Sequence, residues 1–410
     1  KIVVLSAMSG TTNTLVEISD YLYKKNPEGA NEIINKLETK YKQHIDELFA
    51  TPEYKQKGLE IIKSHFDYIR SYTKDLFTLF EEKVVLAQGE LISTAMVNFY
   101  LQECGVKSVL LPALEFMRTD KNAEPDPIYI KEKLLAQLEL YPDADIYITQ
   151  GFICRNAYGE IDNLQRGGSD YTASLIGAAI NASEIQIWTD IDGMHNNDPR
   201  IVDKTAPVRQ LHFEEAAELA YFGAKILHPT CIQPAKYANI PVRLLNTMDP
   251  EAPGTLISND TEKGKIKAVA AKDNITAIKI KSSRMLLAHG FLRKVFEIFE
   301  SYQTSIDMIC TSEVGVSVTV DNTKHLNEIL DDLKKYGTVT VDKEMCIICV
   351  VGDLEWENVG FEAKALDAMR DIPVRMISFG GSNYNISFLI RECDKKVALQ
   401  SLSDMLFNGK

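Results

Sequence analysis

Short apolar segments alternate with helical stretches through much of this 410-residue sequence, and this alternation constrains the fold more than any other feature. Strands are predicted to begin at Ile2, Val84, Ser108, Ile146, Ile185 and Val242. Strands that alternate with helices usually form parallel βα units, so we expect an α/β sheet whose strand C-terminal ends carry the ligand site. The segment from Thr14 to about Glu82 is predicted to be helical, with no visible chemistry.

The composition is that of an ordinary folded protein, with 45% hydrophobic and 25% charged residues. The length predicts two or three domains. A net charge of −13 without a long basic stripe argues against nucleic acid or an anionic membrane as the main partner. No apolar run is expected to span a bilayer, no signal peptide is expected, and the seven scattered cysteines predict reduced thiols in a cytoplasmic protein.

The C-terminal part contains an internal duplication. Gly290-Phe291-Leu292 opens an amphipathic helix, and Gly360-Phe361 opens a similar one roughly seventy residues later. Each copy predicts a strand, a helix, two strands and a second helix, which is a small α+β module. The first copy has Asp307 where the second has Arg375, so only the first offers an acid to a ligand ammonium group. Alternatively, both copies serve only packing and assembly.

A glycine turn, Arg166-Gly167-Gly168-Ser169-Asp170, carries the strongest chemical signal. The glycines let successive N–H groups and a helix N-terminus face an anion, beside a fixed cation, a hydroxyl group and a carboxylate. Alone, such a turn is most often an ordinary junction between a loop and a helix. Three further motifs make phosphate and carboxylate chemistry the better interpretation: Trp188-Thr189-Asp190, Asp198-Pro199-Arg200 and Gly223-Ala224-Lys225.

Together with Val3-Val4-Leu5-Ser6-Ala7-Met8-Ser9-Gly10-Thr11-Thr12-Asn13, these motifs resemble those of the aspartate kinases, in the amino-acid-kinase superfamily. The duplicated part resembles the paired ACT domains of the lysine-sensitive, monofunctional branch. The resemblance implies an amino-acid-kinase fold, a mostly parallel sheet between helices, followed by two α+β ACT domains. The implied domains are a catalytic domain at 1–262, an effector-binding ACT domain at 282–350, and an assembly ACT domain formed by 266–281 with 351–410.

The resemblance also implies the reaction. It is transfer of the γ-phosphoryl group of ATP to the side-chain carboxylate of L-aspartate, with Mg²⁺, as the first step toward lysine, threonine and methionine. The residues implied to bind the substrate are Thr12, Glu90, Arg166 and Ser169. Glu90 would meet the α-ammonium group and Arg166 the α-carboxylate, and Asp170 would organise donors around the phosphoryl group, which makes Asp170 and Arg166 the catalytic residues. The nucleotide would be held by Thr189, Asp190, His195, Arg200 and Lys225.

Regulation is implied as well. L-lysine would inhibit by binding the first ACT domain at Met285, Gly290, Phe291, Leu292, Ser305, Ile306, Asp307, Thr311, Ser312 and Glu313. The ACT domains would also build a homodimer or homotetramer. No metal-binding residues are implied beyond the Mg²⁺ that accompanies ATP.

The sequence departs from the family pattern in two places. It starts after the first strand and the Lys-Phe-Gly-Gly-Thr-Ser loop of the family. Either the chain is truncated or that segment is not among these residues. A chain that truly lacks this segment should be inactive. His195 stands where a tyrosine is usual. Two alternatives remain: a non-catalytic, amino-acid-sensing ACT protein, or another superfamily kinase acting on acetylglutamate, carbamate or uridylate.

Overall fold

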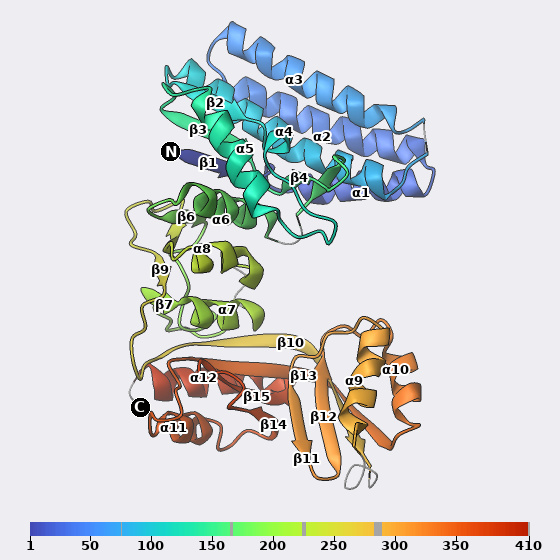
Figure 1. The fold of residues 1–410 in the computed structure, drawn as a ribbon, viewed down its shortest axis with the longest axis vertical. Helices are drawn as coiled ribbons and strands as arrows, with labels where there is room; N and C mark the ends of the chain where they lie inside the picture. The colour runs from blue at the N-terminus through green and yellow to red at the C-terminus, as the bar shows by residue number, and fades with distance from the viewer. Residues whose placement is uncertain (75, 165–166, 224–226, 283–288, 409–410) are drawn as a thin grey trace. The chain divides into compact units, whose positions relative to one another are not determined.

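The computed structural model describes residues 1–74, 76–164, 167–223, 227–282 and 289–408, and the chain forms two compact units (Figure 1). The first unit comprises Lys1–Ile185 and Thr230–Pro241. The second comprises Gln186–Pro229 and Val242–Lys410. Each unit has its own sheets and its own buried core.

The first unit is built on a three-stranded parallel sheet with the order β1-β3-β2. Its strands are β1 (Ile2–Leu5), β2 (Ser108–Leu111) and β3 (Ile146–Gln150). A short antiparallel pair, β4 (Ile153–Arg155) and β5 (Ile161–Asn163), follows β3. The parallel pairing confirms the predicted βα organisation, and it brings the C-terminal ends of the strands to one edge, where ligands bind in such sheets.

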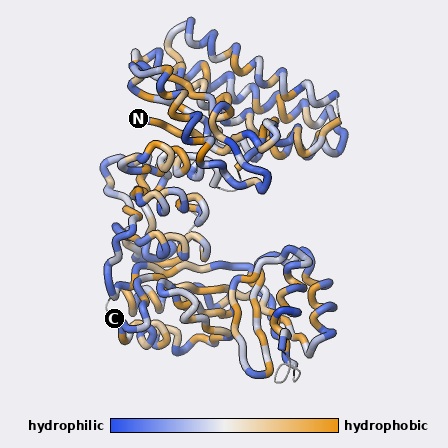
Figure 2. Tube along the Cα trace, viewed as in Figure 1, coloured by the Kyte–Doolittle hydropathy of each residue, from blue (hydrophilic) through white to orange (hydrophobic). Residues whose placement is uncertain are grey.

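Helices account for most of the first unit: α1 (Thr11–Tyr23), α2 (Pro27–Leu48), α3 (Pro52–Ser71), α4 (Leu79–Glu103), α5 (Pro127–Glu139), α6 (Gly168–Ile180) and α8 (Gln233–Tyr237). The first four pack together around a core that contains the buried side chains of Leu15, Ile34, Phe66 and Val85. Hydrophobic and hydrophilic residues alternate along α2 and α3 (Figure 2), as expected of helices with one buried face. The predicted helical segment is therefore confirmed.

The strand predicted at Val84 is wrong, because these residues lie inside α4. A capping box formed by Thr78 and Glu81 starts the helix upstream of the apolar run. The helix contacts α1 and α3 as well as the sheet, so it is buried on several sides and lacks a one-sided pattern. By length and composition α4 could also cross a membrane, contrary to our expectation, but 61% of its apolar window is buried, as in the core helix of a folded domain.

The second unit begins with a four-stranded sheet of order β6-β8-β9-β7 and the helix α7 (Phe213–Tyr221). Its strands are β6 (Ile185–Thr189), β7 (Gln210–His212), β8 (Val242–Asn246) and β9 (Thr255–Ser258). The strands predicted at Ile185 and Val242 are confirmed by β6 and β8. Thr189 and Asp190 lie at the end of β6, and Gly223 follows the end of α7.

A six-stranded antiparallel sheet follows, with the order β11-β12-β10-β13-β15-β14. Its strands are β10 (Ile266–Lys281), β11 (Ile309–Ser312), β12 (Gly315–Val320), β13 (Thr338–Gly352), β14 (Val374–Ser378) and β15 (Asn385–Arg391). Two long strands, β10 and β13, pair along most of their length. They join the two duplicated modules into one sheet.

Two helices pack on each module: α9 (Phe291–Ser301) and α10 (Leu326–Leu333) on the first, α11 (Phe361–Ala368) and α12 (Lys395–Leu406) on the second. Both copies therefore have the predicted order of strand, helix, strand, strand and helix. Short 3₁₀ helices complete the chain: η1 (Ala113–Glu115), η2 (Pro229–Ile232) and η4 (Glu392–Asp394).

Candidate active site and effector site

The loop between β1 and α1 is the central segment of the first candidate site. Gly10 adopts a positive φ of 81° at the N-cap of α1, a conformation that favours glycine. The Ser6 hydroxyl donates a hydrogen bond to Ser169 Oγ at 2.7 Å, and Ser93 Oγ donates to the Ser6 carbonyl oxygen at 2.8 Å. Thr12 lies half-buried in the first turn of α1. The expected convergence of the β1 loop with the Ser169 motif is therefore present.

Glu90 lies against the same loop, although it reaches it from the interior of α4. We expected Glu90 at a strand end; that placement is wrong because α4 is continuous. The side chain is buried, and Oε1 accepts a hydrogen bond from the Ala7 amide at 3.2 Å. Its other oxygen, Oε2, has no hydrogen-bond partner among the residues that the structure describes. Burial raises the pKa of Glu90 to about 7.

The start of α6 carries the second acid of this site. Asp170 lies in the first turn of α6, after Gly167 in a left-handed conformation, and burial raises its pKa to about 6. The backbone directly after β3 approaches this turn so closely that a Cβ on Gly151 would lie 2.4 Å from Ser169 Oγ. Arg166, the predicted partner of the substrate α-carboxylate, lies outside the described residues.

The helical segment in which we expected no chemistry supports this loop. The Tyr41 hydroxyl on α2 lies 2.9 Å from the Thr11 hydroxyl, within hydrogen-bond distance. Lys40, its neighbour, donates from Nζ to the Ser9 carbonyl oxygen at 3.1 Å. Nothing in the spacing of Lys40 and Tyr41 could have identified these contacts, because both residues fit an ordinary amphipathic helix.

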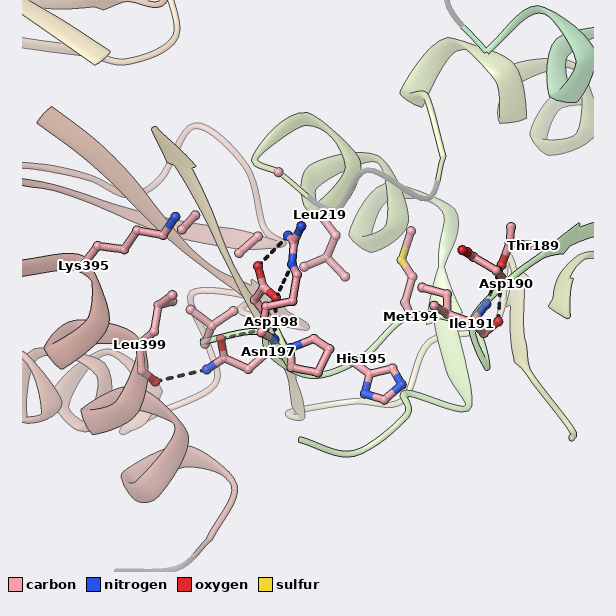
Figure 3. A pocket seen from close by; sticks show the side chains of 16 residues that line it. Thr189, Asp190, Ile191, Met194, His195, Asn197, Asp198, Leu219, Lys395 and Leu399 are labelled. Carbon is pink, nitrogen blue, oxygen red and sulfur yellow. Dashed lines mark hydrogen bonds and ion pairs between the residues drawn. The ribbon is translucent and has the colours of Figure 1, made fainter. Parts of the chain in front are cut away.

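A cavity of about 550 Å³ in the second unit forms the other candidate site (Figure 3). Its lining includes Thr189, Asp190, His195 and Arg200, all predicted nucleotide residues. The apolar part of the wall consists of Ile191, Met194, Leu219, Val269, Ala270, Ala271 and Leu399. An apolar wall with a few polar groups is typical of small-molecule sites. Lys225 lies outside the described residues; Gly223, two positions earlier, lines the cavity.

Arg200 and His195 are two of the polar side chains that line this cavity. Arg200 forms a double contact with Asp198, Nε to Oδ1 at 2.9 Å and Nη2 to Oδ2 at 2.7 Å, and its side chain is 77% exposed. His195 Nδ1 lies 2.9 Å from Thr205 Oγ1, and burial lowers the pKa of the imidazole. At neutral pH the ring is therefore mainly uncharged, which suits contact with a flat, neutral base.

The sequence did not identify every residue of the cavity wall. Lys395 and Leu399 of α12 lie on the opposite side from Thr189 and Asp190 (Figure 3). Asn197, also in the wall, donates a hydrogen bond to the Leu399 carbonyl oxygen at 3.0 Å. No motif links these distant segments of the chain, so only the fold reveals them.

The described effector residues lie in two segments, one at the start of α9 and one on or near the edge strand β11. Gly290 caps α9 with a positive φ of 83°, and Phe291 and Leu292 form its first residues. Ser305 is exposed and Ile306 half-buried before β11, while Thr311, Ser312 and Glu313 are exposed on or just after it. Met285 lies outside the described residues.

Asp307, the acid expected to meet a ligand ammonium group, already has partners within the chain. Oδ1 accepts hydrogen bonds from Lys272 Nζ at 2.7 Å and from the Tyr221 hydroxyl at 2.9 Å. Oδ2 is buried without a partner among the described residues. Burial raises the pKa of Asp307, and the contact with Lys272 opposes this increase. The acid thus links the first module to the end of α7.

The family comparison agrees with this arrangement. Residues 1–246 match the amino acid kinase family, and residues 348–406 match an ACT domain. A kinase domain followed by ACT modules defines an allosteric amino-acid kinase. Within this class, the chain belongs to the aspartokinases, enzymes that phosphorylate aspartate.

Individual relatives support the assignment. The chain is 35% identical to aspartokinase 1, chloroplastic, of Arabidopsis thaliana, over 100% of this chain and 75% of the relative. It is 33% identical to lysine-sensitive aspartokinase 3 of Escherichia coli, over 99% of this chain and 92% of the relative. The structure of E. coli aspartokinase III with aspartate and ADP matches with a TM-score of 0.85 at 32% identity. The match covers 99% of this chain and 93% of that structure. The complex of the same enzyme with lysine and aspartate matches with a TM-score of 0.81 at 32% identity, over 99% of this chain and 92% of that structure.

Proposed function

We propose that the chain transfers the γ-phosphoryl group of ATP to the side-chain carboxylate of L-aspartate, giving 4-phospho-L-aspartate, and that L-lysine inhibits it. The main support is the buried Glu90 carboxylate, whose Oε2 lacks a partner among the described residues. A buried carboxylate oxygen needs a hydrogen-bond donor, and the α-ammonium group of an amino acid supplies one.

In the proposed substrate site, Glu90 binds the α-ammonium group and Arg166 the α-carboxylate, while Thr12 and Ser169 lie nearby. Each charge-assisted contact would contribute roughly 1.5 to 3 kcal/mol. The hydrogen bond from Ser6 to Ser169 holds the β1 loop and the α6 turn together, so the hydroxyl groups are in place before substrate binds. This preorganisation favours a small zwitterionic substrate.

The reaction needs no general base, because the aspartate side chain is already ionised at neutral pH. One of its oxygens forms a bond to the γ-phosphorus while the bond to the ADP oxygen breaks, so catalysis depends on positioning and on neutralising charge. Asp170 would organise donors around the phosphoryl group. Mg²⁺ would neutralise phosphate charge.

The donor set of the chain suits this Mg²⁺. Among the described residues, no three His, Cys, Asp or Glu side chains gather as a metal cage. A Mg²⁺ ion held mainly by phosphate oxygens and water, with one or two carboxylates, fits such a site. Asp190, directly after β6 in the second unit, is the carboxylate that we assign to this ion.

For the nucleotide, we assign the cavity lined by Thr189, Asp190, His195 and Arg200, together with Lys225. The apolar wall and the neutral His195 ring suit the base, and the exposed Arg200 guanidinium suits a phosphate. A histidine replaces the usual tyrosine here, so base stacking would use a smaller ring.

For regulation, we propose that L-lysine binds the first module around Gly290 and Asp307. The E. coli relative carries the name lysine-sensitive, and its structure was solved with lysine and aspartate. The ligand residues would be those predicted from the sequence, with Asp307 meeting an ammonium group. Binding would shift the enzyme toward a less active conformation.

The wider setting is also a proposal. The reaction would be the first step toward lysine, threonine and methionine, in the cytoplasm, in a homodimer or homotetramer built through the ACT modules. Residues 1–262 would form the catalytic domain, 282–350 the effector-binding domain, and 266–281 with 351–410 the assembly domain.

A hydroxamate assay on the full-length protein tests the proposed reaction. With ATP, Mg²⁺ and L-aspartate we expect hydroxamate, and we expect L-lysine to suppress it. Activity with N-acetyl-L-glutamate but not with L-aspartate would indicate a different superfamily kinase. Lysine binding without any phosphoryl transfer would indicate a non-catalytic sensor.

A further inference from the structure

The nucleotide cavity has a wall that comes from the second C-terminal module, the one that the sequence assigned to assembly. Lys395 and Leu399 both lie on α12 and both line the cavity, beside residues of the Asp198-Pro199-Arg200 turn. The matched ACT region, residues 348–406, includes this helix. A nucleotide in the cavity would therefore contact a regulatory module directly.

Asn197 connects the Asp198-Pro199-Arg200 turn to α12 through a hydrogen bond. Its side chain is only 3% exposed, and both of its polar atoms are used (Figure 3). Oδ1 accepts a hydrogen bond from the Asp198 amide at 2.9 Å, and Nδ2 donates to the Leu399 carbonyl oxygen at 3.0 Å. The Oδ1 atom thus stabilises the turn, while the Nδ2 group connects the turn to α12.

A hydrophobic anchor lies just beyond the turn. Val202 is 1% exposed and belongs to the core cluster of the second module, together with Leu399 and Leu402. The partly buried Ile201 packs against the same cluster. Burying these side chains among those of α12 makes separation of the turn from the module unfavourable. The turn that presents Arg200 is therefore held at two neighbouring points, one polar and one apolar.

Lys395 adds positive charge to this wall. Its Nζ lies 2.6 Å from Asp273 Oδ2, at the middle of β10, and its side chain is 19% exposed. Like Arg200, it lines the cavity. The module thus contributes a cation, an apolar side chain and a hydrogen-bond acceptor to one site.

We infer that the second module is part of the nucleotide site, and that Asn197 is a positioning residue that sets ATP affinity by holding the Arg200 turn on α12. This inference rests on the proposed assignment of the cavity to the nucleotide. A shift of α12 would move the turn with it. Regulatory movements of the module would consequently change the affinity for ATP more than the affinity for aspartate.

The first test measures MgADP and aspartate binding to the full-length protein by calorimetry. We expect Asn197→Ala to weaken MgADP binding about tenfold, as expected for loss of one well-positioned hydrogen bond, and to leave aspartate binding unchanged. The matched control is Asn196→Ala, because Asn196 Oδ1 accepts from the Ala206 amide within its own segment. Equal weakening by both substitutions, or normal binding by Asn197→Ala, would overturn the inference.

A second measurement needs no substitution. Hydrogen exchange of the α12 amides should slow when MgADP binds the unmodified protein, and unchanged exchange would contradict the inference. Arg200→Ala distinguishes failure of the nucleotide assignment from failure of the role of α12. If it leaves MgADP binding intact, the cavity is not the nucleotide site; if it weakens binding while Asn197→Ala does not, only the role of α12 fails.

Discussion

The ammonium group of Lys272 lies 2.7 Å from the carboxylate of Asp307. A lysine side chain of the protein itself therefore already pairs with the acid that we propose for the effector. Lys272 also lies 2.9 Å from Asp321 Oδ2 and 4.4 Å from the centre of the Tyr221 ring. Tyr221 ends α7, and Gly223 of the nucleotide cavity follows it closely. These contacts therefore connect the proposed effector acid, Asp307, with the end of α7, close to the cavity that we propose for the nucleotide.

Replacing Lys272 should strengthen effector binding. In Lys272→Met the effector ammonium would no longer compete with an internal one, and we expect L-lysine to bind about tenfold more tightly by calorimetry. Lys279→Met is the control, because Lys279 lies on the same strand and is exposed. Unchanged or weaker binding in Lys272→Met would show that the two cations do not compete for Asp307.

Neutralising Asp307 should remove lysine inhibition. Asp307→Asn keeps the shape of a buried side chain but lacks the charge that an ammonium group requires, so we expect inhibition to disappear while the uninhibited rate stays close to normal. Arg375→Ala, at the corresponding position of the second module, should leave inhibition in place, since Arg375 pairs with Asp342 on the sheet. Inhibition curves for the two variants decide the matter; the reverse pattern would assign the effector to the second module.

Glu90 should make the stability of the ligand-free protein depend on pH. Its pKa is raised from 4.5 to about 7, so the folded state retains a proton that the unfolded state has released. This group therefore favours folding less as the pH rises from about 4.5 to 7, by up to about 3 kcal/mol. In thermal melts, Glu90→Gln should gain stability over the unmodified protein between pH 5 and pH 8. A constant difference would mean that the Glu90 carboxyl is not desolvated.

Arg200 should affect ATP rather than stability. Its side chain is largely exposed, so its ion pair with Asp198 contributes little to folding. We expect Arg200→Ala to raise the KM for ATP about tenfold without changing the melting temperature or the KM for aspartate. Arg209→Ala is the matched control, because Arg209 pairs with Asp192 outside the cavity wall. A similar KM increase in the control would point to a general disturbance of the unit.

The sequence predicted the elements whose patterns are local. The strand at Ile146 and the strand at Ile185 are short apolar runs with polar residues at their ends, and both are present as β3 and β6. The two C-terminal modules were predictable because the same pattern occurs twice. The motifs at Thr189 and Arg200 converge as expected, because strand ends and their loops share one edge of a sheet.

Other features depend on contacts that no local pattern records. The run at Val84 resembles a buried strand, and only the capping box at Thr78 and the surrounding helices make it part of α4. The contact of Asn197 with Leu399 joins residues 202 positions apart, so the sequence gives no indication of it. The pairing of Lys272 with Asp307 was missed for the same reason, since each residue alone fits an exposed charge.

Glu90 is the proposed partner of the substrate ammonium group, and a binding comparison of L-aspartate with succinate tests this role directly. Succinate lacks the ammonium group but keeps both carboxylates. In the full-length protein at pH 8, calorimetry should show L-aspartate binding at least about tenfold more tightly than succinate, and in Glu90→Gln this preference should nearly vanish. If Glu90→Gln retains the full preference for L-aspartate, another group binds the ammonium and the proposed substrate site is wrong.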